Sequence, residues 1–179
     1  MRRRRLRQLA RSCAAAALLA GCSAKPLEWA PEAGVPALLQ APVQNIVSLK
    51  DLRPNVVVLE FWATWCGPCR ATLPHMNKMV DKFQGRPVRF LSITNESAGT
   101  VQEFLKDHPM KAWIGLDPAG EVSSLFRVRS IPQVVVIDPF GRVTLRISTS
   151  WFYASDVEKA LKAKPPLPEA RPGSEPPHP

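Results

Sequence analysis

The sequence predicts an α/β domain, and three observations support this prediction. First, Val56–Phe61 is an apolar run rich in β-branched residues, which is the composition and length of a buried strand. Second, a helix-compatible segment follows it, with apolar residues at helical spacing up to about Gln84. Third, Gln133–Asp138 is an apolar run followed by a Pro-Phe-Gly-Arg turn and a returning strand, which indicates an antiparallel pair.

Residues 1–21 are predicted to be a signal peptide and not part of the fold. A head with six arginines precedes a short apolar stretch, Cys13–Ala20, which is too short to span a bilayer as a stable anchor. The stretch ends in Leu-Ala-Gly-Cys22, which resembles the lipobox of bacterial lipoproteins. The resemblance implies cleavage before Cys22 and a diacylglycerol thioether on its sulfur. An ordinary secretory signal is the alternative, and both imply export.

Removal of this signal changes what the composition implies. The formal net charge falls from +9 to +3, because six arginines and no acidic residues leave with the signal. A nucleic-acid partner is therefore not expected. Cys13 also leaves and Cys22 is acylated, so Cys66 and Cys69 become the only free pair. In an oxidising compartment, they can pair only with each other or with a partner protein.

The predicted domain organisation is simple. Residues 22–35 contain two prolines and a glycine and are predicted to form a tether. Residues 36–55 are expected to form a short edge hairpin that leads to a turn at 51–55. Residues 36–163 are long enough for one domain with a proper core. Residues 164–179 contain seven prolines and no apolar periodicity, so they are predicted to be a disordered tail.

The remaining elements follow from periodicity and turn signals. Met76 and Met79 of the first helix are expected in the core, His75 at the surface, and Pro74 is expected to kink the helix. The elements after this helix are predicted, in order, as a strand at Val88–Thr94, a helix ending near His108, a strand at Trp113–Leu116, a helix at Ala119–Phe126, strands at Gln133–Asp138 and Val143–Ser148, and a last helix with a capping box at Ser155–Glu158 that ends near Ala163.

A Cys66-Gly-Pro-Cys69 motif stands between the first strong strand and its helix. A cysteine at a helix start faces free backbone N–H groups and the positive end of the helix dipole, and both favour its thiolate. We therefore expect Cys66 to be the nucleophile and Cys69, one turn further, to resolve the mixed disulfide. Pro68 suits the first helical turn. A zinc site would need more ligands at suitable spacing, and a structural disulfide across three residues would stabilise little.

The string Phe61-Trp-Ala-Thr-Trp-Cys-Gly-Pro-Cys69 resembles the active-site signature of thioredoxin-like proteins. The element order, the extra helix and strand at about 97–116 and the Ile-Asp-Pro-Phe-Gly-Arg-Val turn at 137–143 resemble the TlpA/ResA-type subfamily over 36–163. The resemblance implies a central mixed sheet flanked by helices. It also implies that Pro132 is cis beside the two cysteines, and that Ile131 contacts the substrate chain with its backbone. Trp65, Gly67 and Pro68 would border the same groove.

The chain departs from this family pattern at three positions. Ser130 and Gln133 flank the Ile-Pro pair where the relatives usually have Gly and Thr, and Thr72 stands where the relatives usually have a glutamate. Glu60 matches the buried aspartate of thioredoxins, and burial is expected to raise its pKa toward the range of a general base for Cys69. The alternatives are that Glu60 faces outward or pairs with a basic residue such as Arg89.

The sequence thus predicts a lipid-anchored, envelope-facing thiol-disulfide oxidoreductase with no metal or other cofactor. The expected partners are disulfide-bearing envelope proteins, a membrane electron donor that re-reduces the pair, and the bilayer through Cys22. Ser23 favours the outer membrane if the cell is Gram-negative. One alternative is a Cu(I) metallochaperone, because thiolates suit this soft ion. The other is a non-catalytic lipoprotein that binds a partner around Trp65 and Pro132.

Overall fold

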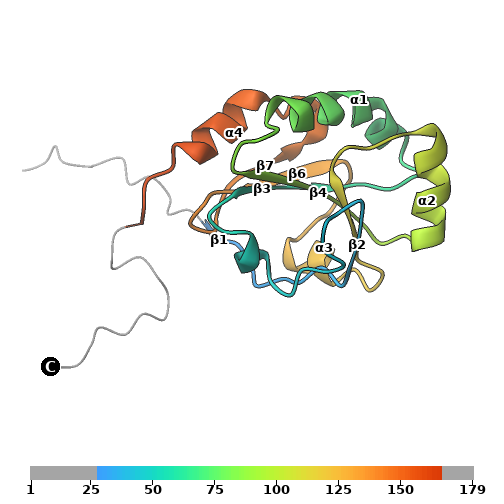
Figure 1. The fold of residues 1–179 in the computed structure, drawn as a ribbon, viewed down its shortest axis with the longest axis horizontal. Coiled ribbons are helices and arrows are strands. Elements are labelled where there is room, and N and C mark those ends of the chain that lie inside the picture. The colour runs from blue at the N-terminus through green and yellow to red at the C-terminus, as the bar shows by residue number, and fades with distance from the viewer. Residues whose placement is uncertain (1–27, 167–179) are drawn as a thin grey trace, which may run out of the picture.

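The computed structural model describes residues 28–166, in which a seven-stranded mixed sheet forms the centre of the domain (Figure 1). The strands lie in the order β1-β7-β6-β3-β4-β5-β2. Their bounds are β1 Glu28–Trp29, β2 Ala37–Leu39, β3 Val56–Phe61, β4 Val88–Thr94, β5 Trp113–Leu116, β6 Gln133–Ile137 and β7 Arg142–Ser148. The helices are α1 Gly67–Lys82, α2 Ala98–Asp107, α3 Glu121–Leu125 and α4 Ala154–Leu161, with short 3₁₀ turns η1 Leu49–Leu52 and η2 Thr149–Trp151.

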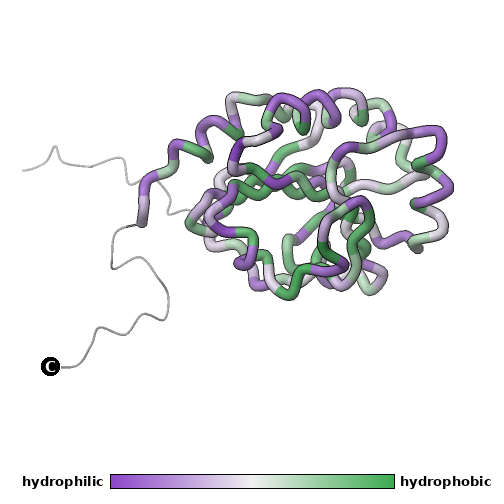
Figure 2. Tube along the Cα trace, in the orientation of Figure 1, coloured by the Kyte–Doolittle hydropathy of each residue, from purple (hydrophilic) through white to green (hydrophobic). Residues whose placement is uncertain are grey.

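Strand β3 is the central element, and all six of its residues are buried. It pairs in parallel with β4 and antiparallel with β6, so the sheet is mixed as predicted. Its side chains alternate between the two faces. Val56 and Val58 pack with α1 and α4, whereas Leu59 and Phe61 pack with α3 and the N-terminal segment. Figure 2 shows the hydrophobic residues concentrated along these central strands.

Most of the predicted elements are confirmed, with bounds that differ by one or two residues. Strands β4 and β5 have the predicted bounds. Met76 and Met79 of α1 are buried, as predicted. The helix α1 continues through Pro74 to Lys82. The prediction for the last helix start is wrong in its detail, because the carboxylate of Asp156 accepts the Tyr153 N–H (3.0 Å), whereas Glu158 pairs with Arg86.

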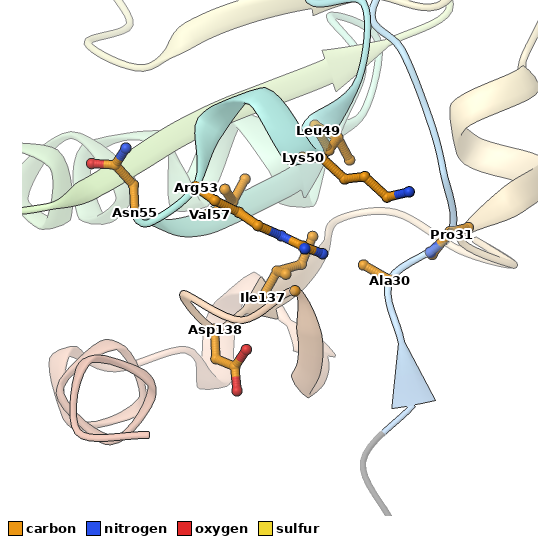
Figure 3. Close-up of a pocket in the computed structure, with 10 residues that line it drawn as sticks. Ala30, Pro31, Leu49, Lys50, Arg53, Asn55, Val57, Ile137 and Asp138 are labelled. Atoms are coloured by element: carbon orange, nitrogen blue, oxygen red, sulfur yellow. The ribbon is translucent and has the colours of Figure 1, made fainter. Parts of the chain in front are cut away.

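The predicted boundary between tether and domain is also wrong. Strand β1, inside the predicted tether, pairs with β7 at Glu28↔Val143. Val35 is fully buried, and its Cγ1 lies so close to Gly115 that a Cβ there would be 2.9 Å away. Figure 3 shows Ala30 and Pro31 beside a small pocket that η1 and the β6–β7 turn also line. The folded domain therefore includes residues 28–35.

The expected edge hairpin at 36–55 is present only in part. An isolated antiparallel bridge joins Val35 to Ile46, and the Leu38 N–H donates to the carbonyl of Gln44 (2.7 Å). Strand β2 itself, however, pairs antiparallel with β5 and forms the edge of the main sheet. A side-chain hydrogen bond also joins the segments next to β2 and β5, because Nε2 of Gln40 donates to the carbonyl of Met110 (3.2 Å).

The predicted signal peptide, Cys22 and most of the predicted tail lie outside the described residues. None of the helices within 28–166 is both long enough and apolar enough to cross a membrane.

Candidate redox site at the first turn of α1

Cys66 and Cys69 form a disulfide at the start of α1, where β3 delivers the chain to the end of the sheet. Cys66 is the N-cap residue, and its Sγ accepts a hydrogen bond from the Cys69 N–H (3.2 Å). Pro68 occupies the first helical turn, where its missing N–H leaves no hydrogen bond unmade. The free N–H groups and the helix dipole thus favour negative charge on the sulfur of Cys66.

The two cysteines are equally buried in this oxidised form, with 4% of each residue exposed. Exposure therefore does not distinguish the two cysteines in this form. Both pack in an apolar cluster with Trp62, Ala63 and Met110.

The residues predicted to contact substrate gather around this disulfide. The register Phe61↔Gln133 places Ile131 and Pro132 beside the segment that leads to Cys66. The Ile131-Pro132 peptide is cis, as the family resemblance implied, and Ile131 packs against the cluster that holds both cysteines. Trp65 is 71% exposed, and a Cβ on Gly67 would meet no atom within 4 Å. The surface next to Cys66 is therefore open to an approaching chain.

Glu60 is buried in β3, on the face of the sheet that α1 covers. Its carboxylate accepts hydrogen bonds from Ser92 Oγ (2.9 Å) and Thr149 Oγ1 (3.3 Å). Loss of hydration raises the pKa of Glu60 to about 7, although the two hydrogen bonds oppose this shift. Neither alternative for Glu60 is found, because it does not face outward and the guanidinium of Arg89 instead lies 5.6 Å from the ring centroid of Trp113.

A small hollow connects Glu60 with the site. Glu60, Trp62 and Cys69 line it together, and its volume of about 10 Å³ is near the minimum that holds one water. The Nε1 of Trp62 is buried, and no described residue accepts its hydrogen bond. The hollow thus has the size of one water, and Glu60 and Arg70 are its charged lining residues among apolar ones.

Glu96 is a site residue that sequence reasoning missed. Its carboxylate accepts from the Thr64 N–H (2.7 Å) and from Thr64 Oγ1 (2.6 Å), two residues before Cys66. Thr94 Oγ1 donates a third hydrogen bond to it (3.2 Å). Glu96 follows β4 and Thr64 follows β3, and these parallel neighbours end at the same edge of the sheet. That shared edge is the signal from which the contact could have been predicted.

Two other residues near the site have structural partners. The hydroxyl of Thr72 donates to the carbonyl of Cys69 (3.0 Å) within α1, so it is bound to the backbone of its own helix. His75 is half-buried, and its Nε2 lies 2.7 Å from the carbonyl oxygen of Phe152. His75 is therefore only partly exposed at the surface, and its ring is held by the chain that leads to α4. No group of three or more His, Cys, Asp or Glu side chains within 28–166 could hold a metal ion.

The fold and the site together define a class of protein. A cysteine pair at the first turn of a helix, beside a cis-proline and above a mixed sheet, is the arrangement of a thioredoxin-like protein. The chain belongs to the AhpC/TSA family, whose model matches residues 28–146.

Individual relatives agree with this assignment. Thiol-disulfide oxidoreductase ResA of Bacillus thuringiensis is 31% identical over 102 residues, which cover 56% of this chain and 59% of that protein. The chain thus spans about three-fifths of that relative. A candidate thiol:disulfide interchange protein DsbE from Chlorobium tepidum shares 30% identity, with a TM-score of 0.61 over 74% of this chain and 90% of its own. A thioredoxin-like superfamily protein has a TM-score of 0.69 at 20% identity, over 78% of this chain and 99% of its own, and shows the fold alone.

Proposed function

We propose that this protein is a thiol-disulfide oxidoreductase that reduces disulfides of envelope proteins. The observation that carries the proposal is the Cys66–Cys69 disulfide at the N-terminus of α1 in a thioredoxin-like fold. The relatives named as thiol-disulfide oxidoreductases support it.

In the reduced protein, the Cys66 thiolate attacks one sulfur of a substrate disulfide, and the other substrate sulfur leaves as a thiolate. The Cys69 thiolate then attacks Sγ of Cys66, which releases the second substrate thiolate and forms the Cys66–Cys69 disulfide. The substrate gains two electrons and the protein loses two. A membrane electron donor returns the pair to the dithiol.

Resolution requires that Cys69 lose its proton, and Glu60 is the proposed base. Burial raises the pKa of a thiol, so Cys69 needs an acceptor in the reduced state. Glu60 lines the same hollow as Cys69, and its pKa of about 7 suits a general base near neutral pH. One water in the hollow would carry the proton from the sulfur to the carboxylate.

The substrate chain would bind over the open surface that Trp65, Gly67 and Pro68 form with Ile131 and Pro132. Trp65 supplies an exposed aromatic side chain, and the half-buried Ile131 supplies backbone beside the cysteines. Ser130 and Gln133 flank this groove and are expected to influence which substrates bind.

The proposed location rests on the N-terminal sequence. We propose that residues 1–21 are removed, that Cys22 is acylated, and that the domain is exposed to the periplasm, with the outer membrane favoured by Ser23. Because Glu28 already pairs with Val143 in the sheet, any tether ends before residue 28 and not at residue 35 as predicted.

Single-cysteine variants test the proposed chemistry. Cys69→Ala should still attack a substrate disulfide but should accumulate the mixed disulfide, because the resolving thiol is absent. Cys66→Ser should neither trap substrate nor reduce it. Non-reducing electrophoresis and mass spectrometry with a disulfide-bonded test protein would show the adduct. Trapping through Cys69 in the Cys66→Ser variant would reverse the assignment, and no adduct with either variant would contradict the proposed function.

A further inference from the structure

The first and the last described residues lie on the same side of the domain, opposite the cysteines. Strand β7 runs from Arg142 to Ser148, and Ser148 lies level with Gln133 and hence with Phe61, near the redox site. Arg142, at the other end of β7, pairs with Trp29 and donates from Nη2 to the carbonyl of Lys164 (2.6 Å). In Figure 1, β1 and the end of α4 accordingly lie far from α2, which borders the redox site.

This end of the domain carries a group of cations, which we call the basic end. Lys82, Arg86 and Lys162 surround Glu158, Arg89 and Lys111 share a hollow with Arg86, and Lys164 lies beside Arg142; these six cations form the group. Within the described residues, two carboxylates pair with members of the group, since Glu158 pairs with Arg86 and Asp81 with Lys111. Arg86 lowers the pKa of Glu158, and the charges of Lys162 and Lys82 lower it further, so three cations surround this one acid.

A hollow of about 310 Å³ opens on the basic end. Arg86, Arg89 and Lys111 line it, together with Phe83, Trp113 and one acid, Asp81, which pairs with Lys111. The guanidinium of Arg89 lies over the Trp113 ring and has no carboxylate within ion-pair distance among the described residues. Cations beside aromatic rings suit a ligand that has a phosphate group next to apolar chains.

The proposed lipid anchor would bring this surface to the membrane. Six chain steps separate Cys22 from Glu28, and they span at most about 20 Å. A lipid on Cys22 therefore holds the end of the domain at which Glu28 enters close to the bilayer. Negative charge on lipid head groups attracts cations strongly only within a Debye length of the surface, and this short tether allows that approach.

We propose that the basic end docks on anionic phospholipid head groups, with the hollow around Arg89 as its phosphate-binding centre. This proposal rests on the lipid anchoring proposed above. Docking of this end points the disulfide away from the membrane, toward soluble substrates. The anchor alone fixes only the distance of the domain from the bilayer, whereas docking also fixes its orientation.

Lysine acetylation of the mature, full-length protein would test the proposal, because four residues of the basic end are lysines. The protein is bound to phosphatidylcholine vesicles with or without phosphatidylglycerol, and mass spectrometry measures the reactivity of each lysine. Phosphatidylglycerol should lower the reactivity of Lys82, Lys162 and Lys164 about fivefold or more, and high salt should restore it. Lys106, exposed on α2, should not change.

A paired variant isolates the cations of the basic end. Lys162→Gln with Lys164→Gln should remove most of the protection of Lys82, whereas Lys106→Gln should leave it intact. Equal reactivity of Lys82 in the two kinds of vesicle would overturn the proposal. Equal protection by inorganic phosphate without vesicles would also overturn it, because the hollow would then bind a free anion.

Failure of the anchor has a different signature. If Cys22 is not acylated, the mature protein will not float with phosphatidylcholine vesicles. Protection of Lys82 upon addition of phosphatidylglycerol vesicles to that soluble protein would still support docking, and its absence would still overturn it.

Discussion

Glu60 is a carboxylic acid within a strand otherwise built of Val, Leu and Phe. Two neighbours make this position tolerable, because Ser92 stands opposite Glu60 in the β3–β4 register and Thr149 follows β7. Their hydroxyls satisfy the carboxylate but do not restore its hydration. The pKa of Glu60 therefore remains raised, at about 7 compared with an ordinary value of 4.5.

This raised pKa predicts a pH-dependent stability. Between pH 4.5 and 7 the folded protein retains a proton on Glu60 that the unfolded chain releases, so the free energy of unfolding falls as the pH rises. The loss should reach about 3 kcal/mol by pH 7 and then level off. Urea denaturation from pH 4 to pH 8 should show this fall in the native chain. Glu60→Gln should lack it, and parallel curves for the two proteins would contradict the prediction.

The same substitution separates the two catalytic steps. Glu60→Gln should slow resolution of the mixed disulfide while the first attack by Cys66 keeps its rate, because only Cys69 needs the base. In the native chain, resolution should become faster as the pH rises through 7. Stopped-flow kinetics resolve both steps. Thr72→Glu in the Glu60→Gln background should partly restore resolution, and normal resolution by Glu60→Gln alone would exclude Glu60 as the base.

Glu96 does not touch the cysteines but positions the loop that precedes Cys66. Two of its three hydrogen bonds hold Thr64, and hence the backbone that leads to Cys66, and the third comes from Thr94. Glu96→Gln can keep at most part of this set, so we expect a loss of about 1–2 kcal/mol in unfolding free energy. We also expect faster hydrogen exchange at the Thr64 amide. Glu103→Gln, an exposed residue of α2, is the matched control. An unchanged Thr64 exchange rate would show that Glu96 does not position this loop.

At the scale of elements, sequence predicted the strands whose hydrophobic pattern is continuous. Strands β3 and β4 are buried along nearly their whole length, so both periodicity and turn residues mark their ends. Strand β1 has only two residues, and its partner Val143 lies more than a hundred residues away. No local pattern encodes such a pairing. The contact between Glu96 and Thr64 is different, because its signal lies in the adjacency of the parallel strands β3 and β4 and not in the local pattern of either segment.

Gly115 in β5 shows how tightly the edge elements pack. A Cβ at this position would lie 2.4 Å from Ile93 Cδ1 and 2.9 Å from Val35 Cγ1. Gly115→Ala should therefore destabilise the domain by about 1–3 kcal/mol through overpacking. Gly99→Ala in α2 is the control, because a Cβ there has space and Ala favours a helix. Chemical denaturation compares the two, and equal stabilities would show that the sheet edge yields without cost.

At the scale of the whole molecule, the redox site and the first and last described residues lie at opposite ends of the domain. The cysteines, the cis-proline and Glu60 lie toward the end of the sheet at which β3 ends. At the opposite end, Glu28 pairs with Val143, and the carbonyl of Lys164 accepts a hydrogen bond from Arg142. Cys66, Cys69, Pro132 and Glu60 could be predicted from sequence, because motif and family resemblance mark them. The basic end could not, because three separate segments of the chain (82–89, 111 and 162–164) contribute its cations.

The N-terminal boundary of the folded domain can be tested by mutation and truncation. If residues 28–35 belong to the domain, Val35 is a core residue, and Val35→Ala should lower the unfolding free energy by about 1–3 kcal/mol. Val47→Ala is the matched control, because Val47 is 82% exposed and its truncation should cost less than about 0.5 kcal/mol. A chain that begins at residue 36 should lose more than Val35→Ala does, since β1 and the buried Ala33 are lost as well. Urea denaturation midpoints rank the three proteins. Equal midpoints for the shortened chain and the Val47→Ala variant would show that residues 28–35 do not belong to the folded domain.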